Sequence, residues 1–410
     1  MGSALLPTTR AQVTGHRFLR RRVEHGLVFG DIRMIHDPLA ARRRAMMFGL
    51  VATVLVAAGA GLLAWLRPAA DPGEAPILQT GGGALFVRVD DRVHPVANLA
   101  SARLIVGEPL DPARIGDDLL AATDRGAPLG IHPAPAALGG GDRAELSWSV
   151  CHGEGTVTVA VGDLVAPLGG HRGVLATAGG ADWLLTTEGR RQLPHPESPE
   201  GRIVRRALGV TESTPRWSPP AEVLNAAAER DPLTLPGVLP EEILDTGTST
   251  WARLPAGVAP LTAVQAEALA DAGVAVRAAP RAELAGHPDA PYHLPLPALA
   301  PMWIDPAEQT VCATGDGQVT TLRPAEHRPI ALSGGGVADQ FLGGLPAAVA
   351  VDTGHGRHVI DATGLRHPVP HPAGLAALGL TDPAPAPWPV IRLLPEGAEL
   401  TPEAALRAAY

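Results

Sequence analysis

Hydrophobic and polar positions divide the 410-residue chain into three stretches of different character. Residues 45–66 form a run of 22 residues without a charge, and as a helix this run would be about 33 Å long, enough to cross the roughly 30 Å core of a bilayer. After it, short apolar runs alternate with glycine and proline turns, which is typical of short strands. The pattern predicts one transmembrane helix between a short leading segment and a large β-rich part.

The leading segment is predicted to contain a helix. It would begin near Thr9 and place Val13, Phe18, Val23 and Leu27 loosely on one side, with arginines between them. Two interpretations fit this pattern equally well. The helix docks on cytoplasmic partner domains, or it is a solvated basic collar that only orients the span.

The part after the span repeats itself. Residues 184–196 match residues 359–372 with one inserted residue, and weaker echoes occur at 85–96 and 257–269. Each copy predicts a strand, a glycine turn, a second short strand and a short helix. A unit this small cannot bury its apolar face alone, so the copies must pack on one another or on a shared core.

Two further segments, residues 149–159 and 310–320, match each other between these copies. Each predicts a hairpin that has Val and then Cys on its first strand, a glycine-containing turn and a β-branched second strand. The whole outer part therefore looks duplicated. We predict the α+β class, with a pseudo-two-fold domain that combines a β-rich central core with small ββα-type repeats.

Charge gives the span a direction. Nine arginines and three acidic residues precede residue 45, a net charge of +6, whereas the remainder has 24 arginines against 39 acidic residues, a net charge of −15. Arg42, Arg43 and Arg44 stand at the start of the span, so the positive-inside rule predicts a cytoplasmic leader and an outer domain on the other side of the membrane. A cleaved signal peptide is the disfavoured alternative, because 44 residues come first. The acidic outer part argues against nucleic-acid binding.

These observations predict a single-pass protein of the plasma (inner) membrane, with the lipid bilayer as a partner. The predicted divisions are a cytoplasmic basic segment (1–44), the transmembrane helix (45–66), a linker (67–79), a first periplasmic half (80–212), a connecting segment (213–244), a second periplasmic half (245–380) and a C-terminal tail (381–410).

Cys151 and Cys312 are the only cysteines, and they occupy equivalent places in the two halves. A pseudo-two-fold axis would bring them together, and an oxidising envelope would preserve the bond, so we predict a disulfide. The closed loop of about 160 residues corresponds to at most about 5 kcal/mol in the chain-entropy model. The alternative is a pair of buried free thiols.

Signatures of common enzyme and metal sites are missing from the sequence. A P-loop needs a lysine, and the chain has none, which excludes a standard Walker ATPase. Zincin, α/β-hydrolase and zinc-ribbon motifs are absent as well. His195, His367 and His371 stand beside prolines, and we interpret them as turn residues rather than metal ligands. No cofactor, metal or catalytic residue is predicted.

Three motifs of the leader carry a family resemblance. They are Thr8-Thr9-Arg10-x-Gln12-Val13-x-Gly15-x-Arg17-Phe18-Leu19, Arg21-Arg22-Val23-Glu24-His25 and Asp31-x-Arg33-Met34-x-x-Asp37-Pro38-Leu39. They resemble the EccB membrane component of the type VII (ESX) secretion system. Proteins of that family have one span, a repeat-containing periplasmic domain and a cysteine in each half of its core. The resemblance implies a structural subunit that anchors and oligomerises on the periplasmic side of the export channel.

The resemblance also implies partners. The leader and span would associate with EccC-like, EccD-like and EccE-like components, and the outer domain with itself and with a mycosin-type protease. The expected docking residues of the leader are Arg10, Gln12, Val13, Gly15, Arg17, Phe18, Arg21, Arg22, Glu24, Arg33, Asp37 and Pro38. Two alternatives stay open: an ATP-binding and ATP-hydrolysing component, because some family members are described as ATPases, and a cell-wall-binding module with tryptophans as sugar platforms.

Overall fold

The computed structural model describes residues 9–30, 32–33, 38–65, 71–139, 146–324 and 328–408. Asp37 of the leader motif lies outside the described residues, and of Pro38 only the backbone is described. The chain forms two compact units, residues 1–71 and 72–410.

The first unit contains two helices, α1 (Arg10–Phe29) and α2 (Pro38–Trp65). Thr9 caps α1, because its hydroxyl accepts a hydrogen bond from the Gln12 amide (3.4 Å) and the Gln12 side chain accepts one from the Thr9 amide (2.9 Å). The predicted start of the leader helix is thereby confirmed. Within α2, Ala41–Leu63 is long and apolar enough to cross a membrane, and its side chains are exposed.

The second unit is built mainly from four repeats with one topology, here named A to D. Repeat A contains β1 (Ile77–Gln79), β2 (Leu85–Val89), β3 (Arg92–Val96), α3 (Leu99–Val106), β4 (Ala113–Arg114) and α4 (Asp117–Ala121). Repeat B contains β8 (Arg172–Ala178), β9 (Ala181–Thr186), β10 (Gly189–Gln192), α5 (Pro199–Ala207), β11 (Arg216–Trp217), α6 (Ala221–Leu224) and β12 (Glu229–Arg230).

The other two repeats follow the same order. Repeat C contains β13 (Glu242–Asp245), β14 (Thr250–Leu254), β15 (Gly257–Leu261), α7 (Ala263–Asp271), β16 (Val276–Ala278) and α8 (Arg281–Leu284). Repeat D contains β22 (Val349–Asp352), β23 (Arg357–Ile360), β24 (Arg366–Pro368), α9 (Pro372–Leu378), β25 (Ala384–Pro385) and α10 (Trp388–Ile391). β25 and α10 thus complete a repeat beyond residue 380, where the sequence analysis ended the second half.

Each repeat is larger than the ββα unit recognised in the sequence. A further antiparallel strand precedes that unit, and a short strand parallel to this first strand follows the helix. A final segment then runs parallel to the third strand. The residues paired there are Val93 with Arg125, Arg190 with Glu229, Val258 with Asp289, and Arg366 with Glu396.

Glycine at the start of the third strand permits this last pairing in repeats B and C. Gly189 has φ +129° and Gly257 has φ +145°. A Cβ atom on them would lie 2.1 Å from the carbonyl oxygen of Ala228 and 2.0 Å from that of Pro288. Only glycine tolerates both the backbone angle and this close approach.

A seven-stranded sheet lies between the repeats, in the order β20-β21-β6-β5-β18-β19-β7. Its strands are β5 (Trp148–Gly153), β6 (Thr156–Val161), β7 (Val165–Pro167), β18 (Val311–Thr314), β19 (Val319–Leu322), β20 (Ile330–Ala331) and β21 (Gln340–Leu342). The two predicted hairpins, β5–β6 and β18–β19, meet through β5 and β18. The outer strands are exchanged, because β7 of the first half pairs with β19 of the second and β21 of the second half pairs with β6 of the first.

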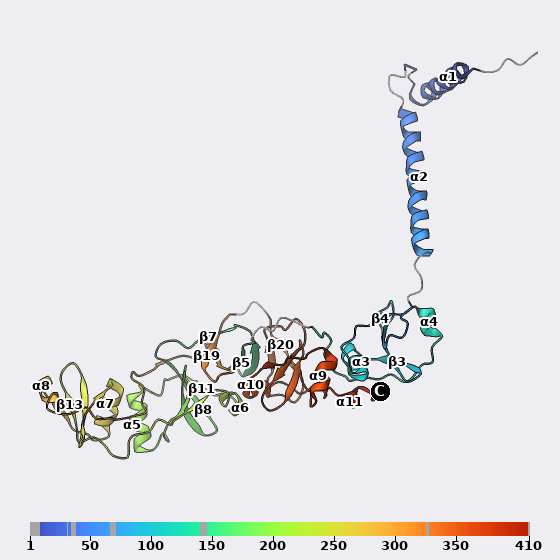
Figure 1. Ribbon diagram of the computed structural model, residues 1–410. Coiled ribbons are helices and arrows are strands. Elements are labelled where there is room, and N and C mark those ends of the chain that lie inside the picture. The colour runs from blue at the N-terminus through green and yellow to red at the C-terminus, as the bar shows by residue number, and fades with distance from the viewer. Residues whose placement is uncertain are drawn as a thin grey trace, which may run out of the picture. The chain divides into compact units, whose positions relative to one another are not determined.

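The repeats pair around this sheet. α3 of repeat A packs against α9 of repeat D, and α5 of repeat B packs against α7 of repeat C. The last helix, α11 (Pro402–Ala405), also packs on α3, and the Gly130 amide donates to the Arg407 carbonyl (3.2 Å). Figure 1 shows α3, α9 and α11 together, so the last turn of the chain closes on its first repeat. Another short strand, β17 (Met302–Trp303), adds to β8.

Candidate assembly site

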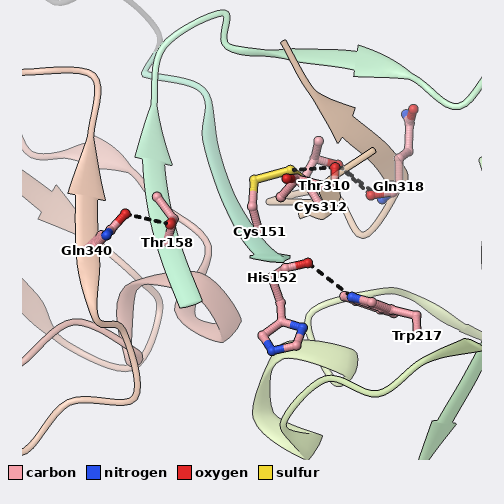
Figure 2. Close-up of a disulfide and its surroundings, with 9 residues drawn as sticks. Cys151, His152, Thr158, Trp217, Thr310, Cys312, Gln318 and Gln340 are labelled. Carbon is pink, nitrogen blue, oxygen red and sulfur yellow. Dashed lines mark hydrogen bonds between the residues drawn. A yellow bond between two sulfur atoms is a disulfide. The ribbon is translucent and has the colours of Figure 1, made fainter. Parts of the chain in front are cut away.

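The centre of the seven-stranded sheet holds a disulfide between Cys151 and Cys312, as the sequence predicted. The two cysteines are direct partners on β5 and β18, their Cα atoms are 3.9 Å apart, and neither side chain is exposed to solvent. They are 161 residues apart in the chain. The bond therefore joins the two hairpins within their antiparallel pairing (Figure 2).

The strands that carry the disulfide bury both of their faces. Val150 and Val311 point into the largest hydrophobic cluster, and the cysteines alternate with them on the opposite face. Beside the bond, the Trp217 indole donates to the His152 carbonyl (3.1 Å), which ties repeat B to β5 (Figure 2). Burial lowers the pKa of His152, although the charge of Asp339 acts in the opposite direction. The disulfide therefore links the two halves of the domain covalently inside the central sheet.

Arginines hold the paired repeats together. Arg103 of α3 is buried, and its Nη1 atom donates to the Leu378 carbonyl of repeat D (3.0 Å). Its other nitrogens bind the Leu110 carbonyl (3.0 Å) and the Asp111 carboxylate (2.9 Å). At the other junction, Arg206 of α5 pairs with Asp271 of α7 (2.6 Å). Polar contacts therefore accompany the apolar packing at both helix pairs.

A buried ion pair fixes α5 on the sheet of repeat B. Arg205 Nη2 lies 2.8 Å from Asp182 Oδ2, and Arg216 Nη1 lies 3.3 Å from Asp182 Oδ1. Burial alone would raise the pKa of Asp182, but the hydrogen bonds from Arg205 and Thr177 and the charge of Arg216 outweigh it. The pKa of Asp182 is consequently below its ordinary value.

Repeats B and D share a second arginine arrangement, on their third strands. Each guanidinium lies over a tryptophan ring and pairs with a glutamate of the final parallel segment. The distances are 4.7 Å from Arg190 to the Trp183 ring and 2.8 Å to Glu229, and 5.3 Å from Arg366 to the Trp388 ring and 2.6 Å to Glu396. Sequence reasoning missed these arginines, although each follows the glycine turn of its copy by one or two residues.

The prediction that His367 is a turn residue was wrong. This residue lies in β24 with no exposed side-chain surface, its Nδ1 atom lies 2.9 Å from the Ala398 carbonyl, and its Nε2 atom lies 3.9 Å from Asp361. The following Pro368 ends the strand rather than forming a turn. His371 stands at the N-cap position of α9 without a side-chain capping hydrogen bond, and His195 lies in the loop before α5. Among the described residues, no three His, Cys, Asp or Glu side chains gather as a metal site.

The predicted docking residues of the leader lie on one helix, apart from Arg33 and the two residues beyond it. Most of their side chains are exposed, and Glu24 is partly buried. Glu24 pairs with Arg20 (3.3 Å) and with Arg43 of α2 (3.3 Å). Arg42, Arg43 and Arg44 belong to α2 itself. Their roles in docking and orientation stay predictions.

Two adjoining hollows have volumes of about 570 and 540 Å³: the first lies between repeat B and the β18–β19 turn of the central sheet, and the second between repeat B and residues 293–301. The arginines in the first already bind protein groups: Arg191 lies 3.5 Å from the Glu188 carboxylate, and Arg230 donates to the Glu188 carbonyl (2.8 Å). The phosphate group of a nucleotide bound in the first hollow would have to compete with these contacts for the two arginines.

The profile of the family described as "Type VII secretion system ESX-1, transport TM domain B" matches residues 5–256 and 242–409. The chain belongs to the EccB family. Among its relatives, "ESX-1 secretion system ATPase EccB1" of Mycobacterium tuberculosis (strain ATCC 25618 / H37Rv) is 30% identical, over 97% of this chain and 94% of the relative. "ESX-3 secretion system ATPase EccB3" of Mycolicibacterium smegmatis (strain ATCC 700084 / mc(2)155) is 35% identical, over 57% of this chain and 47% of the relative.

Chains of two solved ESX structures share this fold. A chain of "Structure of an intact ESX-5 inner membrane complex, Composite C3 model" has a TM-score of 0.67 and 27% identity, and the alignment covers 100% of this chain and 97% of that one. A chain of "Structure of EccB3 dimer from the ESX-3 core complex" also has a TM-score of 0.67, at 24% identity, over 82% and 100% of the two chains. The predicted α+β class, with one apolar helix before a β-rich repeat domain, is confirmed.

Proposed function

We propose that this EccB protein is a structural subunit of a type VII secretion complex in the plasma membrane. The observation that carries the proposal is the similarity, over the full length of the chain, to a chain from an ESX-5 inner membrane complex. The disulfide-linked central sheet and the arginine contacts between paired repeats fit this role, because a scaffold has to hold its binding surfaces in a fixed geometry.

We further infer the orientation and the partners. Residues 1–44 are cytoplasmic and meet EccC-like, EccD-like and EccE-like components together with the span. The acidic domain after the span is periplasmic and meets other copies of itself and a mycosin-type protease. Support comes from the three arginines before the apolar segment and from the net charge of −15 after residue 44.

Co-purification tests the partners. The full chain, solubilised in mild detergent, should bring EccC-like and EccD-like proteins with it. Reversal of two leader charges (Arg21→Glu with Arg22→Glu) should reduce their yield, whereas reversal of two exposed outer arginines (Arg392→Glu with Arg407→Glu) should not. Equal yields from both variants would remove the leader from the docking site.

Thiol accessibility tests the orientation. Both native cysteines are bonded and buried, so one introduced cysteine is the only reactive thiol. On spheroplasts, a membrane-impermeant maleimide should label Gly237→Cys and leave Thr14→Cys unlabelled until the membrane is opened. Labelling in the reverse order would overturn the proposed topology.

ATP hydrolysis is the second candidate, because the similar curated proteins carry "ATPase" in their names. Phosphate release by the purified full chain should stay at background. A specific activity that remains constant through successive purification steps would favour the enzymatic function instead.

A further inference from the structure

The leader helix α1 exposes large apolar side chains. Phe18, Leu19, Val23 and Leu27 are 53%, 59%, 61% and 81% exposed. At 100° per residue, these four lie within an arc of about 180° around the helix axis. Such a surface on an isolated helix is unfavourable in water and calls for an apolar partner.

The opposite half of α1 is basic. Arg10, Arg17, Arg20 and Arg21 lie there together with Glu24, although the exposed Val13 and Val28 lie among them and Arg22 projects within the apolar arc. The helix has five arginines and one glutamate, a net charge of +4. A cationic half beside an apolar half is typical of helices that lie in the interface of an anionic membrane.

The chain keeps α1 close to the span. Eight residues, 30–37, connect its end to the start of α2, and fully extended they reach at most about 29 Å. The 3.3 Å contact between Glu24 and Arg43 links the two helices directly. Arg43 lies within the first turn of the apolar stretch Ala41–Leu63 of α2, where the headgroups of a bilayer would begin.

We propose that α1 is an interfacial helix that lies on the cytoplasmic leaflet. Phe18, Leu19, Val23 and Leu27 enter the boundary between headgroups and acyl chains, and the arginines contact anionic headgroups. The assignment to the cytoplasmic leaflet rests on the orientation proposed above, and the membrane contact itself does not. In this arrangement the lipid covers the apolar half of α1, and the polar half stays accessible to protein partners.

The test uses the full chain in lipid nanodiscs. A fluorophore is attached to Leu19→Cys, near the middle of the apolar arc, or to the matched control Thr14→Cys in the basic half. Acyl-chain-brominated lipid should quench the Leu19→Cys label at least about twofold more than the control, and aqueous iodide should do the reverse. Replacing phosphatidylglycerol with phosphatidylcholine, or Arg17 and Arg21 with Gln, should reduce the lipid quenching.

Equal quenching of the two labels in anionic nanodiscs would overturn the proposal. So would shielding of the Leu19→Cys label that appears only after EccC-like and EccD-like proteins are added, because a protein would then cover the apolar half. The first measurement uses nanodiscs that contain only this chain and lipid, so it does not depend on the proposed protein partners. Failed co-purification therefore leaves this result intact, and a failed quenching test leaves the scaffold role intact.

Discussion

Single residues decide how closely the strands of a repeat approach one another. Gly257, which opens the third strand of repeat C, was not singled out in the sequence, and Gly189, which opens that of repeat B, was recognised there only as a turn residue. The role that both glycines have, leaving space for a carbonyl oxygen from a segment about 30 to 40 residues later, depends on a contact between distant parts of the chain. A local pattern does not contain that information.

Gly257→Ala should destabilise the protein by about 2–4 kcal/mol, because its Cβ would meet the Pro288 oxygen at 2.0 Å with φ near +145°. Gly237→Ala is the matched control, since nothing lies within 4 Å of its Cβ and no left-handed φ applies. Denaturant unfolding of the full chain in detergent, followed by tryptophan fluorescence, measures both. Similar midpoints for the two variants would contradict the packing argument.

Asp182→Asn should cost about 3 kcal/mol at pH 7, because it leaves the buried Arg205 without its charge partner. The pKa of Asp182 is lowered in the folded state, so its contribution is fully present above the unfolded pKa of about 3.9 and disappears as the pH falls through the folded pKa. The stability difference between variant and wild type should therefore shrink below about pH 4.

The exposed pair of Asp163 and Arg323 provides the control for this prediction. Asp163 is 84% exposed, so Asp163→Asn should change the free energy of unfolding by less than about 0.5 kcal/mol at any of these pH values. Unfolding curves at pH 7, 5 and 3 make the comparison. A deficit of Asp182→Asn that stays constant down to pH 3 would show that the lost interaction is not the ionised carboxylate.

Secondary-structure elements were predicted unevenly. The leader helix, the apolar helix and the two cysteine hairpins carry strong local signals, namely a capping box, an uncharged run and glycine turns, and all appear. The fourth strand of each repeat has only two or three residues, too few for a periodic pattern, and it exists because the first strand offers it a parallel edge. Arg103 was missed for a similar reason, because its acceptor belongs to α9, far along the chain.

Replacing Thr9 tests how much the capping box stabilises the start of α1. Thr9→Ala removes the hydroxyl that accepts from the Gln12 amide and should cost about 1 kcal/mol of local helix stability. Thr9→Ser, which keeps the hydroxyl, should behave like the wild type. Amide hydrogen exchange in the first turn of α1, measured on the full chain, should increase about fivefold in Thr9→Ala alone. Unchanged exchange would mean that other contacts hold the turn.

At the scale of the whole molecule, the sequence predicted the duplication and the disulfide because both rest on equivalence between segments rather than on local geometry. The pairing of repeat A with D and of B with C follows from the same symmetry, but it became evident only once the central hairpins were placed side by side. The exchange of outer strands had no signal in the sequence.

The buried bond should resist reductant while the protein is folded. Dithiothreitol in native buffer should leave Cys151 and Cys312 unalkylated, and the same reductant in denaturant should expose two thiols, because neither side chain is accessible. The double variant Cys151→Ala with Cys312→Ala should lose up to about 5 kcal/mol of stability. Alkylation detected by mass spectrometry under native reducing conditions would contradict the shielding.

Because outer strands are exchanged between the halves, the central sheet cannot be completed until the second half of the chain is available. In the orientation proposed above, the first half of the domain emerges from the membrane before the second, and β6 has no neighbour on its outer edge until residue 340 follows, some 180 residues after β6 ends at residue 161. During that interval the outer edge of β6 stays open and can pair with another strand. We therefore expect that slowing translocation between the two halves raises aggregation more than slowing it after the last repeat.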